Sequence, residues 1–343
     1  MTLFLSILGF SILILAHEFG HFWVARRYKM PVKEFGIGFP PRLWAHKAKD
    51  GVEYSVNWLP FGGFVRISGE GDNPKEEISD DPAIFRNRPA GERAAVMLAG
   101  VAINFLLGWL LIATAFSIGT PPAIVVVGIQ KNSPAETAGF MMGDVVLGFK
   151  DAAQFVQFSQ EHRGQEVELT VLRNGKQLPV KVTPRVVTVE GEGAIGLGVS
   201  DAGSPSLPIH KAVWEALKEV WYIITMSLTA FGALLKGIFT SGSISSEVMG
   251  PVGILNTAKH TGALGLVYLL RLMGLISVNL AVLNLIPFPA LDGGRVAFLA
   301  IEKIIRRKLP QNAEAWVNVI GFGLLLLLIL FVTVRDVGRI FFS

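Results

Sequence analysis

Three ionisable residues stand together near the end of the first apolar run, within "ILILAHEFGHFWVARRYK" at positions 12–29. On a helix, positions i and i+4 lie on one face, so His17 and His21 can bind one metal ion through two imidazoles. Glu18 is adjacent and can reach a water bound to that metal. These residue types at this spacing predict a hydrolytic zinc site in which Glu18 transfers the proton.

The alternative is that these three residues only cap a helix end near the lipid headgroups. Histidine and glutamate inside an apolar span are costly to bury and are usually functional, which favours the metal site. A third ligand should lie at the same membrane depth, and Asp292 in "NLIPFPALDGGR" (284–295) is the candidate. Pro287 and Pro289 prevent a regular helix there, and Gly293–Gly294 extends the irregularity. Asp292 could also serve as the N-cap of a following helix, which does not exclude a ligand role.

The composition places these residues in a membrane protein. Hydrophobic residues make up 51% of the 343-residue chain, and only 17% are charged. Three uncharged stretches, 94–118, 272–291 and 315–334, are long enough to span a bilayer, and 3–25 is a fourth if it tolerates HEFGH. The net charge of +4 comes from basic residues beside the spans, which indicates topology and not nucleic-acid binding. The absence of cysteine excludes disulfides and thiolate ligands.

The distribution of positive charge predicts the topology. Because the basic residues follow the first span, the N-terminus should be outside and the segment 26–93 cytoplasmic. The predicted spans are 1–25, 94–118, 264–292 and 313–336, with an extracytoplasmic connector at 201–263 and a basic cytoplasmic loop at 293–312. Residues 214–239 are expected to lie on or dip into the outer face, because a crossing there would put the basic loop outside.

HEFGH in the first span and NLIPFPALDGG in a later one resemble the site-2 protease family of intramembrane zinc metalloproteases, in particular its regulator-of-sigma-E protease branch. The resemblance covers nearly the whole chain, including "FGIGFPPRLW" (35–44), "WLPFGGFVRISGE" (58–70) and "LAGVAINF" (98–105). It implies zinc ligands at His17, His21 and Asp292 and a catalytic role for Glu18. It also implies that Asn284 and Asn279 hold substrate. Val101 replaces a usual proline, and Arg295 stands where a histidine is frequent.

The cytoplasmic stretch "GVEYSVNWLPFGGFVRI" (51–67) alternates and is broken by Pro60 and Gly62–Gly63, which predicts a β-hairpin. The resemblance implies that it is a membrane-associated loop beside the active site. An edge strand there would supply hydrogen bonds to an unwound substrate segment. A simple surface hairpin is the alternative.

Residues 121–200 are expected to form one extracytoplasmic α/β domain. A strand, a short helix after Ser133–Pro134 and a second strand precede a hairpin at 166–184 with Asn174–Gly175 at its turn. This order resembles a PDZ domain of the permuted bacterial type. "GAIGLGVS" (193–200) would then be the carboxylate-binding loop, in which Gly196, Leu197 and Gly198 receive a peptide C-terminus. "KDAAQF" stands where Asp-Gly is usual, and a domain that only filters substrates by size is the alternative.

The sequence therefore predicts a polytopic α-helical membrane protein with a cytoplasmic β-hairpin and one PDZ domain. The resemblance implies a zinc endopeptidase of the plasma (inner) membrane whose active site lies near the cytoplasmic side. It would cut single-pass membrane proteins, such as anti-sigma-factor-like substrates or signal-peptide remnants, after another protease has made an extracytoplasmic cut. The expected partners are these substrates, the upstream protease and the lipid bilayer, without nucleic acid. The alternatives are a catalytically silent PDZ scaffold and a zinc transporter.

Overall fold

The computed structural model describes residues 2–70, 81–173, 176–187, 193–241, 250–263, 265–307 and 309–342. The chain divides into two compact units. The first comprises Met1–Ile112, Val213–Lys259 and Leu270–Ser343, and it contains the predicted metal ligands. The second comprises Ala113–Ala212 and His260–Leu269, and it contains the whole of the predicted PDZ region, 121–200.

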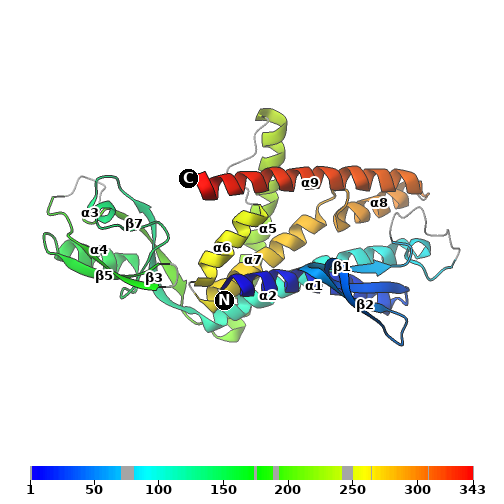
Figure 1. The fold of residues 1–343 in the computed structure, drawn as a ribbon, viewed down its shortest axis with the longest axis horizontal. Coiled ribbons are helices and arrows are strands. Elements are labelled where there is room, and N and C mark those ends of the chain that lie inside the picture. The colour runs from blue at the N-terminus through cyan, green and yellow to red at the C-terminus, as the bar shows by residue number, and fades with distance from the viewer. Residues whose placement is uncertain are drawn as a thin grey trace. The chain divides into compact units, whose positions relative to one another are not determined.

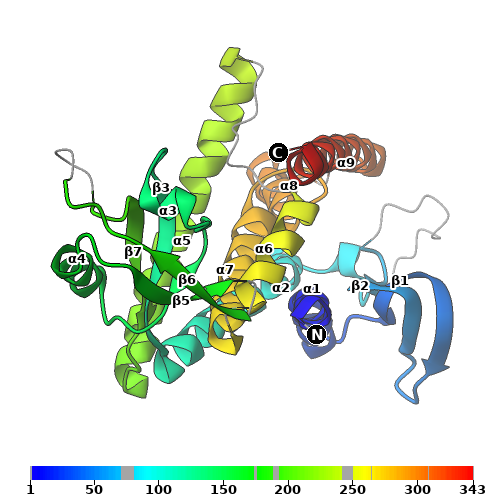
Figure 2. The ribbon, with the colours of Figure 1, turned by 60° about the vertical axis from the view of Figure 1, so that its left-hand side comes forward.

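Four of the described helices are long and apolar enough to cross a membrane: α1 (Thr2–Arg27), α2 (Ala90–Ile118), α7 (Leu266–Leu285) and α9 (Gln311–Phe342). Each overlaps one of the four predicted spans, so the predicted number of candidate spans is confirmed, while their crossing of the membrane stays a prediction. Figures 1 and 2 show α1 and α2 side by side. The third span is shorter than predicted, because α7 ends at Leu285 and not at Asp292. Pro287 accounts for this end, since its ring cannot continue the helix and offers no N–H.

The segment predicted as a cytoplasmic loop, 293–312, consists largely of helix α8 (Asp292–Ile305). The prediction that Gly293–Gly294 extends the irregular backbone was wrong, because both residues are buried in the first turn of this helix. A Cβ at Gly293 would lie 2.3 Å from the carbonyl oxygen of Leu285. Glycine here therefore lets α8 begin directly against the end of α7.

Two further helices in the described chain are α5 (Ile209–Ser241) and α6 (Pro251–Ala263). The predicted interfacial segment 214–239 lies within α5, which is 33 residues long and is not among the four candidate spans. Within the first unit, α5 contacts α7 through an ion pair between Glu219 and Arg271 at 2.9 Å. Its placement on the outer face of the membrane stays a prediction.

The two-stranded sheet of the first unit is formed by β1 (Val32–Lys47) and β2 (Glu53–Ile67), which pair antiparallel beside α1 (Figure 2). The predicted hairpin at 51–67 was therefore wrong: these residues form one strand, and its partner precedes it. Gly62 has a φ of +81° but sits at an irregularity of the ladder and not at a turn. The chain reverses earlier, where the Ala48 N–H donates to the Val52 carbonyl at 2.9 Å.

One segment of β1 lies between two segments of β2. Residues 34–37 each have one partner in 63–66 and another in 53–56. Glu34 is only 2% exposed and accepts hydrogen bonds from the Ser55 hydroxyl at 2.7 Å and from Arg42 at 2.8 Å. These bonds connect Glu34 to the 53–56 segment of β2 and to the later part of β1, and they satisfy a buried charge that would be costly without a partner.

The second unit contains a five-stranded sheet with the order β6-β5-β4-β3-β7. Its strands are β3 (Thr120–Ile129), β4 (Val145–Val146), β5 (Val167–Arg173), β6 (Lys176–Val182) and β7 (Leu197–Ser204). The predicted hairpin is confirmed, because β5 and β6 pair antiparallel. Its expected turn at Asn174–Gly175 lies outside the described residues.

Two helices accompany this sheet. Helix α3 (Pro134–Thr137) starts at Ser133, whose hydroxyl accepts the Glu136 N–H at 3.2 Å, as the Ser-Pro signal predicts. Helix α4 (Ala152–Glu161) was not predicted from the sequence. Its signal is a reciprocal cap in "KDAAQ": Asp151 accepts the Gln154 N–H, and the Gln154 side chain accepts the Lys150 N–H, each at 2.7 Å.

Buried Asp144 joins the turn before β4 to β5 through Arg173, at 2.6 Å. The hydrogen bonds that the Arg173 guanidinium donates to this carboxylate raise the pKa of the guanidinium above its ordinary value. The ion pair thus fixes one end of the sheet whose core contains Ile124, Val146 and Val171.

Candidate active site

The three predicted metal ligands meet at one point of the first unit. His17 and His21 lie one turn apart on α1, and Asp292 is the first residue of α8. The Asp292 Oδ2 atom lies 3.0 Å from His17 Nε2 and 3.4 Å from His21 Nε2, and the two Nε2 atoms are 3.1 Å apart. Both histidines are buried, with 6% and 5% exposed. Residues 275 positions apart in sequence thus present three donor atoms to a shared centre.

These separations fit a zinc ion. Tetrahedral coordination with bonds of about 2.0–2.1 Å places neighbouring ligand atoms roughly 3.3 Å apart. Asp292 Oδ2 is buried and makes no hydrogen bond with a described residue. Two imidazole nitrogens and a carboxylate oxygen face one another as lone-pair acceptors, and a cation between them satisfies all three. Two nitrogens and one oxygen are also a donor set that zinc accepts in hydrolytic sites.

The alternative in which Asp292 is the N-cap of the following helix does not hold. Leu291 is the N-cap of α8, and Asp292 occupies the first helical position without a capping hydrogen bond. The irregular stretch between α7 and α8 ends with Ala290, whose φ is +72° and whose N–H donates to Asn318 at 3.1 Å. This anchored turn directs the Asp292 carboxylate toward α1.

Helix α2 orients both histidine rings. The Nδ1 of His21 donates to the Val96 carbonyl at 2.8 Å, which leaves the lone pair of Nε2 available to a metal ion. The side-chain nitrogen of Asn104 lies 3.4 Å from His17 Nδ1, while its buried oxygen has no partner among the described residues. Rotating this amide by half a turn lets the oxygen accept the His17 Nδ1–H and satisfies both groups. Asn104 is thus a supporting residue that the sequence analysis missed, although it lies in the "LAGVAINF" stretch.

A glycine contact brings α2 close enough for these bonds. A Cβ at Gly100 would lie 2.5 Å from His21 Nε2 and 2.8 Å from His17 Cε1. Opposite it on α1, a Cβ at Gly20 would lie 2.6 Å from the Ala99 carbonyl oxygen. Only residues without a side chain fit at this crossing. Gly100 was not singled out from sequence, because one glycine in an apolar helix gives no indication of what it faces.

Glu18 lies between the two histidines in sequence and is half-buried. Its Oε2 atom accepts the backbone N–H of Val65 at 3.0 Å. Because this N–H points to α1, the backbone of β2 reaches the site directly. The carboxylate is thereby held beside the proposed metal ligands by a strand from the segment that the resemblance places next to the active site.

The two predicted substrate asparagines differ in position. The side-chain nitrogen of Asn284 lies 3.4 Å from His17 Nε2, within reach of a group bound at the site. Asn279 instead accepts a hydrogen bond from the Ser227 hydroxyl of α5. The structure therefore brings Asn284 to the metal ligands and connects Asn279 to a neighbouring helix.

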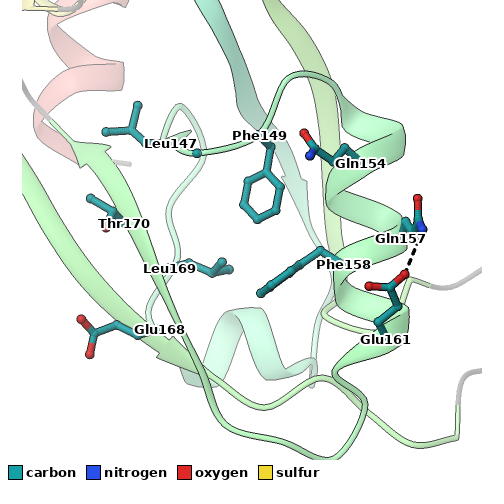
Figure 3. Close-up of a pocket in the computed structure, with 10 residues that line it drawn as sticks. Leu147, Phe149, Gln154, Gln157, Phe158, Glu161, Glu168, Leu169 and Thr170 are labelled. Atoms are coloured by element: carbon teal, nitrogen blue, oxygen red, sulfur yellow. Dashed lines mark hydrogen bonds between the residues drawn. The ribbon is translucent and has the colours of Figure 1, made fainter.

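The predicted carboxylate-binding residues, Gly196, Leu197 and Gly198, lie at the start of β7. Gly196 has a φ of +81°, and a Cβ there would lie 2.3 Å from Ser133 Cβ. The same Cβ would lie 3.3 Å from an Arg185 guanidinium nitrogen, a cation next to this loop that the sequence analysis missed. A separate pocket of about 520 Å³ lies between α4 and the region of β4 and β5 (Figure 3). Its lining includes none of the three loop residues.

Comparison with known proteins agrees with this geometry. The model of peptidase family M50 matches residues 5–328, which is most of the chain. The chain belongs to peptidase family M50. A provisionally named zinc metalloprotease of Clostridium acetobutylicum is 32% identical to this M50 protein over 97% of the chain and 96% of its own length. The zinc metalloprotease RasP of Geobacillus kaustophilus is 29% identical over 98% and 97% of the two chains.

The regulator of sigma-E protease RseP of Salmonella typhimurium is 26% identical over 97% of this M50 protein and 98% of its own length. Family membership and these relatives make the chain a zinc metalloprotease with Zn²⁺ as its cofactor. Its four apolar helices agree with an M50 protein of the membrane. The alignments with RasP and RseP run over 420 and 444 positions, so these relatives contain segments that the 343-residue chain lacks.

Proposed function

We propose that this M50 protein cuts single-pass membrane proteins within the bilayer, with zinc bound by His17, His21 and Asp292. The observation that carries the proposal is the buried convergence of these three side chains at 3.0–3.4 Å. Zinc held there supplies a coordinated water of lowered pKa, about 7, and polarises the scissile carbonyl. The other steps fall to groups of the protein itself.

Glu18 is the proposed proton carrier. Its carboxylate accepts a proton from the attacking water and delivers it to the leaving amine, so that the peptide bond breaks without releasing a free anion. The hydrogen bond from Val65 fixes one carboxylate oxygen and so orients the other. Asn284 is close enough to donate to the substrate carbonyl, because its amide lies 3.4 Å from His17 Nε2.

The β1–β2 sheet is proposed to bind the substrate segment in an extended conformation. A transmembrane substrate hides its amides in helical hydrogen bonds, so a segment must become extended before it can be cut. Support for a role of β2 is the contact between its backbone at Val65 and Glu18. Trp44 and Trp58 on this sheet are 57% and 65% exposed, which favours its proposed association with the membrane.

The second unit is proposed to act as a PDZ domain on the extracytoplasmic side. Its sheet order, the helix α4 and the glycine loop before β7 support this assignment. The domain would either bind the new C-terminus that the first cut leaves on a substrate, or exclude from the active site those substrates that have not been trimmed. In both cases another protease acts first, and the products are a released regulator or a cleared signal-peptide remnant.

Substitution of Glu18 tests the proposal. Glu18→Gln keeps the size of the side chain but removes the base. We expect zinc to stay bound while cleavage falls by a factor on the order of 10² to 10⁴. Cleavage of a trimmed single-pass substrate and zinc per chain are measured on the same preparation. Near-normal cleavage by zinc-loaded Glu18→Gln would refute the mechanism and reopen the scaffold and transporter alternatives.

A further inference from the structure

An ion pair connects α8 to the segment that follows β2. Arg295 stands one turn after the proposed ligand Asp292, on the same face of α8. Its Nη1 atom lies 2.6 Å from Oε1 of Glu70, three residues beyond the end of β2. The two side chains are 29% and 17% exposed, so water screens this pair only in part.

This contact completes a closed path around the proposed site. Asp292 and Arg295 both belong to α8, and Arg295 pairs with Glu70. Glu70 in turn follows β2, the strand that contains Val65. The Val65 N–H then donates to Glu18, which is adjacent to His17. Two connections thus fix the position of Asp292 relative to the carboxylate of Glu18. One runs through the packing of the helices, and the other through the ion pair between Arg295 and Glu70.

We propose that Arg295 and Glu70 form a positioning clasp that holds the substrate-facing backbone of β2 in alignment with the metal site. The clasp rests on the function proposed above. Neither residue touches the reacting atoms. Their role is to keep β2, and with it Glu18 and an extended substrate, at a fixed distance from the carboxylate of Asp292. Arginine suits this role because it stays charged throughout the accessible pH range.

A second ion pair separates this role from general support of α8. Glu302, two turns further along the helix, pairs with Arg93 of α2 at 3.0 Å, and both side chains are largely buried. The same arginine lies over the Phe85 ring at 5.5 Å. Because this pair anchors α8 to α2 without involving β2, α8 should keep its place when the clasp is opened. Only the alignment of β2 should then be lost.

A double-mutant cycle tests the clasp. Glu70→Gln, Arg295→Gln and the double variant are purified, and kcat, KM and zinc content are measured with a trimmed single-pass substrate. Each single change should lower kcat by about 10-fold while zinc stays at the wild-type level, because misalignment of reacting groups acts mainly on the chemical step. The kcat of the double variant should be no lower than that of the more impaired single variant, since each partner acts through the other. Arg295→Lys should recover part of the rate.

The matched control is Asp50→Asn, which opens the ion pair at 2.9 Å between Arg26 of α1 and Asp50 in the turn between β1 and β2, without touching α8. It should cleave like wild type. Losses that multiply in the double variant, or single variants with a normal kcat, would overturn the clasp. Loss of zinc in step with cleavage would overturn it as well, because the pair would then support the metal site and not the alignment. A zinc-loaded wild type without cleavage would instead refute the proposed function.

Discussion

Gly100 should decide whether the metal site can form at all. In Gly100→Ala the new methyl carbon would lie 2.5 Å from His21 Nε2, whereas non-bonded heavy atoms approach to about 3.5 Å. Relief requires a displacement of about 1 Å, either of the imidazole or of α2 against α1. Zinc sites tolerate ligand displacements of roughly 0.2 Å. We therefore expect the affinity for zinc to fall by about 10²-fold or more, since even changes behind the ligands cost about 10- to 100-fold.

The cost to folding should be much smaller. Overpacking of a helix contact typically costs about 1–3 kcal/mol, and replacing glycine by alanine inside a helix returns about 1 kcal/mol. The net destabilisation of Gly100→Ala is therefore about 0–2 kcal/mol. The variant should be a folded protein that binds zinc poorly, which distinguishes it from a variant that has simply unfolded.

The assay is zinc per chain across a series of buffered zinc concentrations, with thermal unfolding of the metal-free protein measured in parallel. Gly91→Ala is the matched control, because it lies in the same helix and a Cβ there meets nothing within 4 Å. It should bind zinc like wild type. An affinity of Gly100→Ala for zinc within about twofold of the control would show that the α1–α2 crossing does not require glycine at this position.

Three further predictions concern the ligand set, the topology and the second unit. Asp292→Ala should lose most of its zinc because two histidines alone form a weak site, and full retention would move the third ligand elsewhere. A reporter fused after Lys308 should be cytoplasmic, and an outside signal there contradicts the four-span topology. Deletion of 121–200 should allow untrimmed substrates to be cut, and if only trimmed substrates are cleaved, the domain is not a size filter.

The sequence predicted that His17, His21 and Asp292 would lie together, because local spacing and membrane depth can both be inferred from one chain. The His17–His21 spacing fixes a shared helix face, and Asp292 follows a long apolar run that returns to the same depth. It could not show Asn104 or Gly100, because an apolar helix offers no sign of which face crosses α1. The partner of β2 was also missed, because the alternation within 51–67 is interrupted by glycine and proline, which suggested a turn where the strand is only irregular.

The elements around the site bear on two properties that a metalloprotease must combine, metal affinity and the alignment of the groups that transfer the proton. Helix α2 contributes Val96, Gly100 and Asn104, which orient the imidazoles and so govern metal affinity. Strand β2 contacts Glu18 and so bears on proton transfer, while α8 supplies a ligand and connects to the sheet. If this division is right, substitutions in α2 should change zinc content before they change kcat at saturating zinc. Substitutions at the junction of β2 and α8 should do the reverse, because alignment can be lost while every ligand stays in place.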